Sequence, residues 1–320
     1  MGSKEIIRPP RLKPGSRVGL LAPAGPLLER DDLSRGRELC QALDWEPVLL
    51  PHAGGRHGYL AGTDEERLDD LNAALRNPVL DAIWCLRGGY GVTRILDQVD
   101  FAAMAARPRV IIGYSDITAL LLAAWRHTGL VTFHGPMARA PLTSFSRDHQ
   151  ARVLASAVVP GRLGRLPQPD DVLVPKSPRI VTIRGGKAEG RLIGGNLTLV
   201  QCLIGTRHLP DFDGAILFLE EVNEDLYRID RMLAHLRMAG ALDRVAGVVV
   251  GQVTELSQRG ADGSMGYDEI LATYLEPLGV PVAYGFPFGH VESQWTLPVG
   301  VMARLDASAG ELELLESGVS

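Results

Sequence analysis

Short apolar runs alternate with stretches of helical hydrophobic spacing along the first half of the chain. The apolar runs predict strands at 17–22, 47–50, 82–86, 110–113 and 131–133. Helical spacing occurs at 30–44, at 64–75 after a capping Thr63, at 93–96 and directly after Ser115. This alternation predicts a parallel sheet covered by helices, with its functional loops beyond the carboxyl ends of the strands.

The second half is richer in strands. Apolar runs predict strands at 180–184, 189–193, 215–219, 245–253, 297–305 and 311–315, and helices are expected at 197–202, 225–238 and 267–275. The proline-rich segment between the two halves cannot form an interior strand or helix. We therefore expect an N-terminal parallel-sheet α/β domain over 1–160, a linker over 161–179 and a C-terminal β-rich α/β domain over 180–320.

Composition narrows the class of protein. The 320 residues are 46% hydrophobic and 22% charged, as in soluble globular proteins, and the net charge of −5 leaves no basic surface suited to nucleic acid. The three cysteines form no Cys-x-x-Cys pair, which favours a reducing compartment over a disulfide scaffold. The apolar run near the N-terminus is too short for a signal peptide, and no run approaches the length of a membrane span. A cytoplasmic protein is expected.

The candidate nucleophile is Ser115, in the sequence Gly113-Tyr114-Ser115-Asp116 between a predicted strand and a predicted helix. A serine at such a sharp turn projects its hydroxyl toward the first N–H groups of the helix, where negative charge is stabilised. Hydrolase elbows carry a glycine two residues after the serine, whereas this chain has Ile117. The alternative is that Ser115 or Asp116 merely caps the helix.

A serine nucleophile requires a base and an acid that orients the base. His290 is the best candidate base, because it lies in a loop shaped by glycine and proline, and His134 is the alternative. The acid is expected where the strand over 215–219 ends, at Glu220 or Glu221, of which only one can face the histidine. Asp230 is a third possibility.

Backbone N–H groups are the candidate donors for an oxyanion. The N–H of Asp116 follows the serine directly, and Gly88-Gly89 allows a second N–H to approach a substrate. No phosphate-binding loop ending in Lys-Ser or Lys-Thr is present, and no set of residues has metal-ligand spacing.

Several sequence blocks occur together in a fixed order. They are Leu21-Ala22-Pro23-Ala24-Gly25-Pro26, Arg87-Gly88-Gly89-Tyr90-Gly91, Gly113-Tyr114-Ser115-Asp116, His134-Gly135-Pro136, Gly194-Gly195-Asn196-Leu197, Leu219-Glu220-Glu221 and Gly285-Phe286-Pro287-Phe288-Gly289-His290. Together they span nearly the whole chain. The chain thus resembles the LD-carboxypeptidases, serine peptidases of the muramoyltetrapeptide carboxypeptidase type.

The resemblance implies a Ser–His–Glu triad assembled across two domains. Ser115 would attack, His290 would be the general base and Glu220 would orient it, with Glu220 preferred over Glu221 because the family's acid directly follows the strand. The family's oxyanion donors fall on the N–H groups of Gly89 and Asp116. The resemblance also implies no metal or cofactor, and a homodimer.

The reaction implied by the resemblance is removal of the terminal D-alanine from a murein tetrapeptide, in cytoplasmic recycling of cell-wall peptides. The partner would be a small peptide, and neither nucleic acid nor a membrane is expected. Two alternatives remain open: a peptidase of the microcin-immunity type that cleaves peptidyl- or aminoacyl-nucleotides, and a non-catalytic peptide-binding protein.

Overall fold

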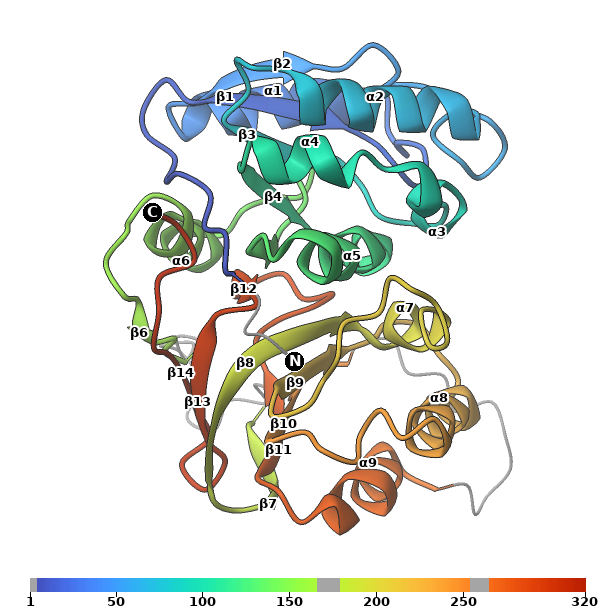
Figure 1. Ribbon diagram of the computed structural model, residues 1–320, viewed down its shortest axis with the longest axis vertical. Coiled ribbons are helices and arrows are strands. Elements are labelled where there is room, and N and C mark those ends of the chain that lie inside the picture. The colour runs from blue at the N-terminus through green and yellow to red at the C-terminus, as the bar shows by residue number, and fades with distance from the viewer. Residues whose placement is uncertain (1–4, 166–178, 254–264) are drawn as a thin grey trace, which may run out of the picture.

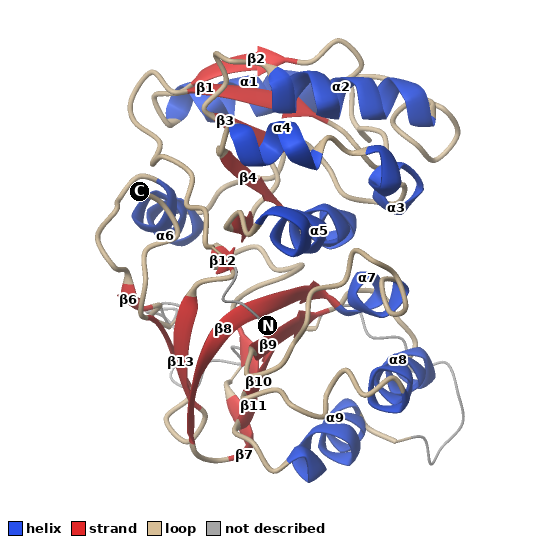
Figure 2. Cartoon of the chain, in the orientation of Figure 1, coloured by secondary structure: helices blue, strands red, loops and turns tan. Residues whose placement is uncertain are grey.

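Two sheets, one above the other, organise the molecule (Figure 1). The computed structural model describes residues 5–165, 179–253 and 265–320. Secondary structure is distributed through both halves, as Figure 2 shows, so each sheet has helices beside it. The fold is therefore a mixed α/β architecture with a parallel N-terminal sheet and a β-rich C-terminal half, as the sequence predicts.

Among the described residues, the first sheet has the strand order β12-β5-β4-β3-β1-β2. Its members are β1 (Arg17–Leu21), β2 (Glu46–Leu49), β3 (Ala82–Cys85), β4 (Val110–Gly113), β5 (Thr132–His134) and β12 (Leu297–Val299). The strands β1 to β5 are mutually parallel, so their carboxyl ends share one edge of the sheet. The order reverses at β1, between β2 and β3, and such switch points are where open α/β sheets bind ligands.

The edge strand β12 is antiparallel to β5 and comes from the C-terminal part of the chain. The first sheet thus includes residues that the sequence assigns to the second domain. Chain order and sheet membership differ here because a strand can join whichever sheet edge has unpaired hydrogen-bonding groups. The proposed domain boundaries stay a prediction about folding units.

The helices of the first half precede and follow these strands. They are α1 (Asp32–Ala42), α2 (Asp64–Arg76), α3 (Val92–Ile95), α4 (Phe101–Ala106), α5 (Thr118–Thr128) and α6 (Ser144–Leu154). Helix α5 is buried from Thr118 to Trp125. It contacts β4 and β5 of the first sheet as well as β8 and α7 of the second half, so both sides of it are covered (Figure 1). A helix that is apolar all round fits this central position.

In the part of the chain that the structure describes, the second sheet has the order β6-β14-β13-β8-β9-β10-β11-β7. Its members are β6 (Gly161–Arg162), β7 (Val181–Arg184), β8 (Lys187–Asn196), β9 (Ile216–Glu220), β10 (Gly247–Gly251), β11 (Val282–Phe286), β13 (Met302–Asp306) and β14 (Glu311–Leu314). The four strands β8 to β11 run parallel, and the outer strands are antiparallel. The parallel strands end at the edge that carries Glu220.

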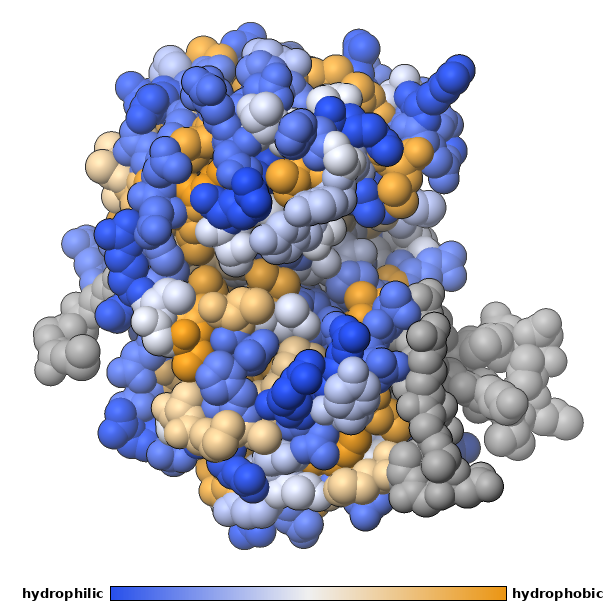
Figure 3. All heavy atoms as spheres, turned by 90° about the vertical axis from the view of Figure 1, so that its right-hand side faces the viewer, coloured by the Kyte–Doolittle hydropathy of each residue, from blue (hydrophilic) through white to orange (hydrophobic). Residues whose placement is uncertain are grey.

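The helices beside the second sheet are α7 (Leu197–Cys202), α8 (Leu226–Met238) and α9 (Tyr267–Leu275). Hydrophilic residues dominate the side of the molecule shown in Figure 3, and hydrophobic residues appear there in small separate groups. Within the described ranges, no helix has both the length and the apolarity needed to cross a bilayer.

Most of the expected linker, 166–178, lies outside the described residues, whereas its first part forms β6.

The sequence analysis predicted most elements and missed the helices α4 and α6 and the strands β6 and β11. Thr63 forms the expected cap of α2, and Glu66 completes a reciprocal capping box. The helices α4 and α6 were not expected, since the first is short and uniformly small or apolar and the second is mostly polar. The strand β11 was not expected either, because it contains Gly285.

Candidate active site

Ser115 lies on a strained turn between β4 and α5. The strand ends at Gly113, Tyr114 is extended, and Ser115 has a φ of +59°, in the left-handed region that side chains avoid. This conformation costs about 1–3 kcal/mol and persists only where the surroundings enforce it. A Cβ at Gly113 would come within 3.0 Å of the Ile117 side chain, so a glycine is needed there. Ile117 thus packs over the strand end.

The Gly88–Gly89 loop passes directly beside the serine. A Cβ at Gly88 would lie 2.8 Å from Cβ of Ser115 and 3.4 Å from the backbone nitrogen of Asp116. Gly89 has a φ of +102°, and a Cβ there would meet the backbone of Gly25 at 3.1 Å. The loop after β3 therefore brings backbone close to Ser115, which only glycines permit.

The side chain of Asp116 serves a neighbouring helix. Its Oδ2 accepts a hydrogen bond of 2.8 Å from the backbone N–H of Val92, the first residue of α3. Burial raises the pKa of Asp116 to about 6. In the described structure neither Ser115 nor Asp116 caps α5 through its side chain, so the capping alternative for Ser115 is wrong.

His290 and Glu220 form a hydrogen-bonded pair. His290 Nδ1 lies 2.7 Å from Oε2 of Glu220, whose side chain is completely buried at the end of β9. Burial by itself raises the pKa of Glu220, but the hydrogen bond and charge of His290, together with His134, outweigh it and leave the pKa below its usual value. Glu220 is thus a carboxylate that accepts from Nδ1–H of His290.

The loop that carries His290 is fitted to Glu220. Gly289 has a φ of +96°, and a Cβ there would lie 2.6 Å from Oε2 of Glu220. The His290 ring then packs edge-on against the ring of Tyr114, with 4.8 Å between centroids. His290 thus contacts the residue that directly precedes Ser115, although the two come from opposite halves of the chain.

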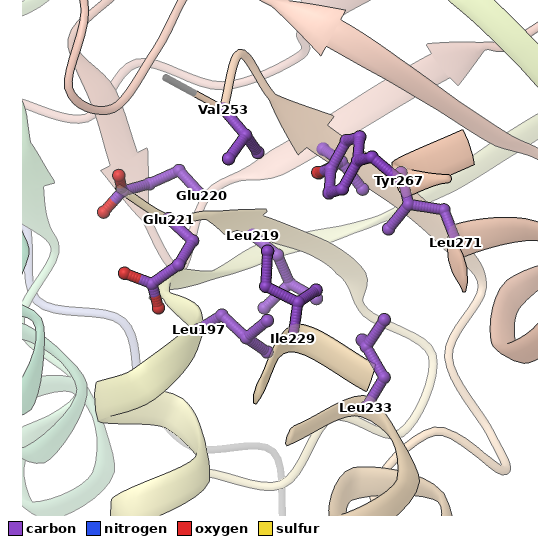
Figure 4. Close-up of a pocket in the computed structure, with 10 residues that line it drawn as sticks. Leu197, Leu219, Glu220, Glu221, Ile229, Leu233, Val253, Tyr267 and Leu271 are labelled. Atoms are coloured by element: carbon purple, nitrogen blue, oxygen red, sulfur yellow. The ribbon is translucent and has the colours of Figure 1, made fainter. Parts of the chain in front are cut away.

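Glu221 accepts hydrogen bonds at the start of α7 and not from a histidine. Its Oε1 accepts from Asn196 Nδ2 and from the N–H of Val222, and its Oε2 accepts from both the N–H and the hydroxyl of Thr198. These bonds fix the start of α7. Figure 4 shows both carboxylates extending away from the apolar side chains that line a pocket beside them, among them Leu197, Leu219 and Ile229.

One connection between the halves was not expected from the sequence. The N–H of Asn196 donates to Oγ1 of Thr118 at 3.0 Å, and a Cβ at Gly195 would clash with Thr118 at 2.4 Å. Asn196 is also in register with Glu220 across β8 and β9. The Gly194-Gly195-Asn196 block therefore joins the start of α5 to the strand that carries Glu220, and the paired glycines were the signal for this close contact.

The alternative candidates lie elsewhere or are inaccessible. His134 is fully buried among Tyr114, Phe218 and Phe288, and burial lowers its pKa to about 4. Asp230 accepts a hydrogen bond from Tyr274 on α9 instead of orienting a histidine. In the described ranges, no cluster of three or more His, Cys, Asp or Glu residues is placed to hold a metal ion.

Family models for the LD-carboxypeptidase N-terminal and C-terminal domains match residues 18–135 and 189–305. A putative carboxypeptidase of Streptomyces coelicolor is 41% identical, with 97% of each chain covered. The murein tetrapeptide carboxypeptidase of Pseudomonas aeruginosa is 36% identical, with 91% of this chain and 94% of that protein covered.

Among solved structures, MccF in complex with glutamyl sulfamoyl guanosine superimposes with a TM-score of 0.88 at 27% identity, covering 98% of this chain and 99% of that one. MccF is named as the microcin C7 self-immunity protein of Escherichia coli. The family models together cover more than half of the sequence, and the relatives cover nearly all of it. The chain belongs to the LD-carboxypeptidase family of peptidases.

Proposed function

We propose that this protein is a serine L,D-carboxypeptidase that removes the terminal D-alanine from murein tetrapeptides. The observation that carries the proposal is the pair of His290 and buried Glu220, packed on Tyr114 beside the strained Ser115. The similarity to the murein tetrapeptide carboxypeptidase of Pseudomonas aeruginosa supports the choice of substrate.

The first half-reaction forms an acyl-enzyme. Because the Glu220 carboxylate holds the proton of His290 on Nδ1, the lone pair is on Nε2, which accepts the hydroxyl proton as Ser115 Oγ attacks the carbonyl carbon. The N–H groups of Gly89 and Asp116 donate to the resulting oxyanion. The imidazolium then protonates the amine of D-alanine, the carbon–nitrogen bond breaks, and D-alanine leaves.

The second half-reaction restores the enzyme. Water attacks the ester carbonyl while Nε2 of His290 takes its proton, and the carbon–oxygen bond to Ser115 breaks with return of that proton to Oγ. The products are a tripeptide carboxylate and free D-alanine. The negative charge of Glu220, buried against the ring, stabilises the imidazolium that forms in both steps.

The proposal also includes the cellular compartment, the oligomeric state and the absence of a cofactor. We place the protein in the cytoplasm, where the small peptides released by cell-wall turnover are recycled, and we expect it to act as a homodimer without a metal or organic cofactor. The three thiols, of which Cys40 and Cys85 are buried, are compatible with a reducing compartment.

A second candidate function rests on the MccF structure. Its TM-score is 0.88, and its ligand is glutamyl sulfamoyl guanosine. A peptidase of this type would cleave an aminoacyl- or peptidyl-nucleotide with the same three side chains. The two functions differ in the group that occupies the site beyond the scissile bond.

The deciding experiment offers both substrates to the purified protein. Murein tetrapeptide is incubated alone and with an aminoacyl sulfamoyl adenylate, and products are identified by mass spectrometry. Release of D-alanine, with little cleavage of the nucleotide, is the expected result. Cleavage of only the nucleotide would favour the second function, and cleavage of neither would favour a non-catalytic peptide-binding protein.

A further inference from the structure

The ring of Tyr114 packs against two histidines that come from different elements. Its centroid is 4.8 Å from that of His290, with 64° between the ring planes, and 5.9 Å from that of His134, with 63° between the planes. His134 is fully buried at the end of β5 and packs edge-on against Phe218 and Phe288 in turn. Tyr114 therefore joins the candidate base to a buried aromatic cluster built from both halves of the chain.

The backbone of Tyr114 is held on both sides. Before it, the carbonyl of Gly113 accepts a hydrogen bond of 3.1 Å from the N–H of Gly135. After it, the carbonyl of Tyr114 accepts a hydrogen bond of 3.2 Å from the N–H of Ile117, and Ser115 has a positive φ. The ring is thus attached to the strained turn itself, one residue from the candidate nucleophile.

The loop that carries His290 is anchored to α6 beyond the histidine. The N–H of Gln294 donates to Oγ of Ser146 at 2.8 Å, and the N–H of Thr296 donates to Nδ1 of His149 at 3.2 Å. The His290 side chain keeps 20% of its surface exposed, whereas these anchors are buried. The loop therefore brings the histidine to the site, and the orientation of its ring depends on what the ring itself contacts.

A hydrogen bond to one nitrogen of an imidazole does not determine where the other nitrogen points. The bond of 2.7 Å between Nδ1 of His290 and Glu220 fixes the distance of the ring from the carboxylate, but the side-chain torsion next to a histidine ring has only broad preferences. General-base catalysis requires Nε2 to face the hydroxyl within hydrogen-bond reach. An aromatic ring that packs against the imidazole restricts the rotation that the hydrogen bond permits.

We propose that Tyr114 is a positioning residue that fixes the plane of the His290 ring, so that Nε2 faces Ser115. The proposal rests on the proposed function, in which His290 takes the hydroxyl proton of Ser115. Because Tyr114 directly precedes the serine, one residue takes part in the turn of the nucleophile and in the orientation of the base. Burial and the charge of Glu220 raise the pKa of Tyr114, so the phenol stays neutral and acts through the shape of its ring.

The first test separates the ring from the rest of the side chain. Tyr114→Phe keeps the ring, and its kcat for D-alanine release should stay within about threefold of the wild type. Tyr114→Leu keeps an apolar side chain without a planar ring. It should lower kcat by about 10- to 100-fold and change KM by less than about threefold, because a misdirected Nε2 slows proton transfer and leaves substrate binding intact.

The matched control is Phe133→Leu. Phe133 is also a buried ring of the first sheet, on β5, where it is in register with Ile112 of β4. Urea unfolding should show that this variant loses at least as much stability as Tyr114→Leu, while its kcat stays within about threefold of the wild type. If Phe133→Leu loses as much kcat as Tyr114→Leu, or if Tyr114→Phe does, the positioning role is overturned.

A second measurement needs no catalysis and remains decisive if the proposed function fails. Histidine nitrogens are labelled with 15N, and the signals of His290 are identified by their absence in His290→Ala. In the wild type and in Tyr114→Phe we expect a sharp Nδ1–H signal, because Glu220 and the packed ring hold this proton. In Tyr114→Leu the signal should broaden through exchange with water.

Unchanged His290 signals in folded Tyr114→Leu would contradict the proposal, whatever the activity of the enzyme. A wild type that shows the expected change of signal between Tyr114→Phe and Tyr114→Leu but releases no D-alanine would support the positioning of the ring and overturn the proposed function alone.

Discussion

The carboxyl edges of the two sheets contribute to the candidate site by different means. At the first edge the arrangement depends on backbone: Ser115 has a positive φ, and Gly88 and Gly113 allow contacts that a Cβ would prevent. At the second edge it depends on side chains, since a buried Glu220 holds His290 through a hydrogen bond of 2.7 Å. One edge positions the candidate nucleophile through steric fit, and the other positions the candidate base through charge.

The two edges should therefore be sensitive to different kinds of substitution. Adding a single methyl group should disturb the first edge, because the space is already filled. Removing a single charge should disturb the second, because the carboxylate is buried and its interaction with the ring is little screened. Substitutions can separate the two effects.

The largest effect is expected at the nucleophile. Ser115→Ala should lower kcat for D-alanine release by roughly 10⁴- to 10⁶-fold, because the covalent step is lost while binding and the oxyanion donors remain. Stopped assays with mass-spectrometric detection of D-alanine measure this decrease of kcat. If Ser115→Ala keeps its activity within tenfold of wild type, Ser115 is not the nucleophile.

The adjacent glutamates test the second edge. Glu220→Gln should lower kcat by about 10²- to 10⁴-fold, because a neutral amide no longer stabilises the imidazolium. Glu221→Gln should keep kcat within about tenfold and lower the free energy of unfolding by about 1–3 kcal/mol, because Glu221 accepts from Asn196, Thr198 and Val222. Kinetics and urea unfolding of both variants give the comparison.

An exchange of these two outcomes, with Glu221→Gln inactive and Glu220→Gln merely less stable, would contradict the assignment of the acid.

A smaller effect is expected from steric change at the first edge. Gly88→Ala adds a Cβ that would lie 2.8 Å from Cβ of Ser115. The displaced serine should lower kcat by about 10- to 100-fold. Gly266→Ala is the matched control, since its Cβ meets nothing within 4 Å and its φ is −71°. If the two alanine variants have equal kcat, the close approach of the 88–89 loop has no role.

The smallest effect is a loss of folding stability at acid pH, to which His134 contributes. Burial lowers the pKa of His134 from 6.5 to about 4. The unfolded chain therefore binds a proton at this residue at higher pH than the folded chain does, and stability is lost as the pH falls from 6.5 toward 4. From pH 7 to pH 5 this residue should cost about 2 kcal/mol.

Urea unfolding of His134→Gln at both pH values measures this contribution. The variant should lose less stability than the wild type over the interval, whatever its stability at pH 7. An equal pH dependence in both proteins would show that His134 does not remain neutral in the fold.

Local patterns were enough to predict much of the fold. The alternation of strands and helices in the first half and the capping of α2 by Thr63 depend on neighbouring residues, which the sequence displays directly. The pairing of β12 with β5 joins residues more than 150 positions apart, and no local pattern encodes it. The short helix α4 owes its place to packing beside α2 and α5.

The candidate site also combines local features, which the sequence displays, with long-range contacts, which it does not. Ser115 was recognisable from its turn, which is a local feature. The pairing of His290 with Glu220 and not Glu221 spans 70 positions. The residues alone left both glutamates open, and only the family resemblance favoured Glu220.

The central claim is that Ser115 and His290 act as one unit across the two edges. The most direct measurement is labelling with a serine-directed fluorophosphonate, followed by mass spectrometry of the digested protein. The account predicts one label on the peptide that contains Ser115 in the wild type and in Glu221→Gln, and loss of that label in His290→Ala. A label on another serine, or an unchanged rate of labelling in folded His290→Ala, would contradict it.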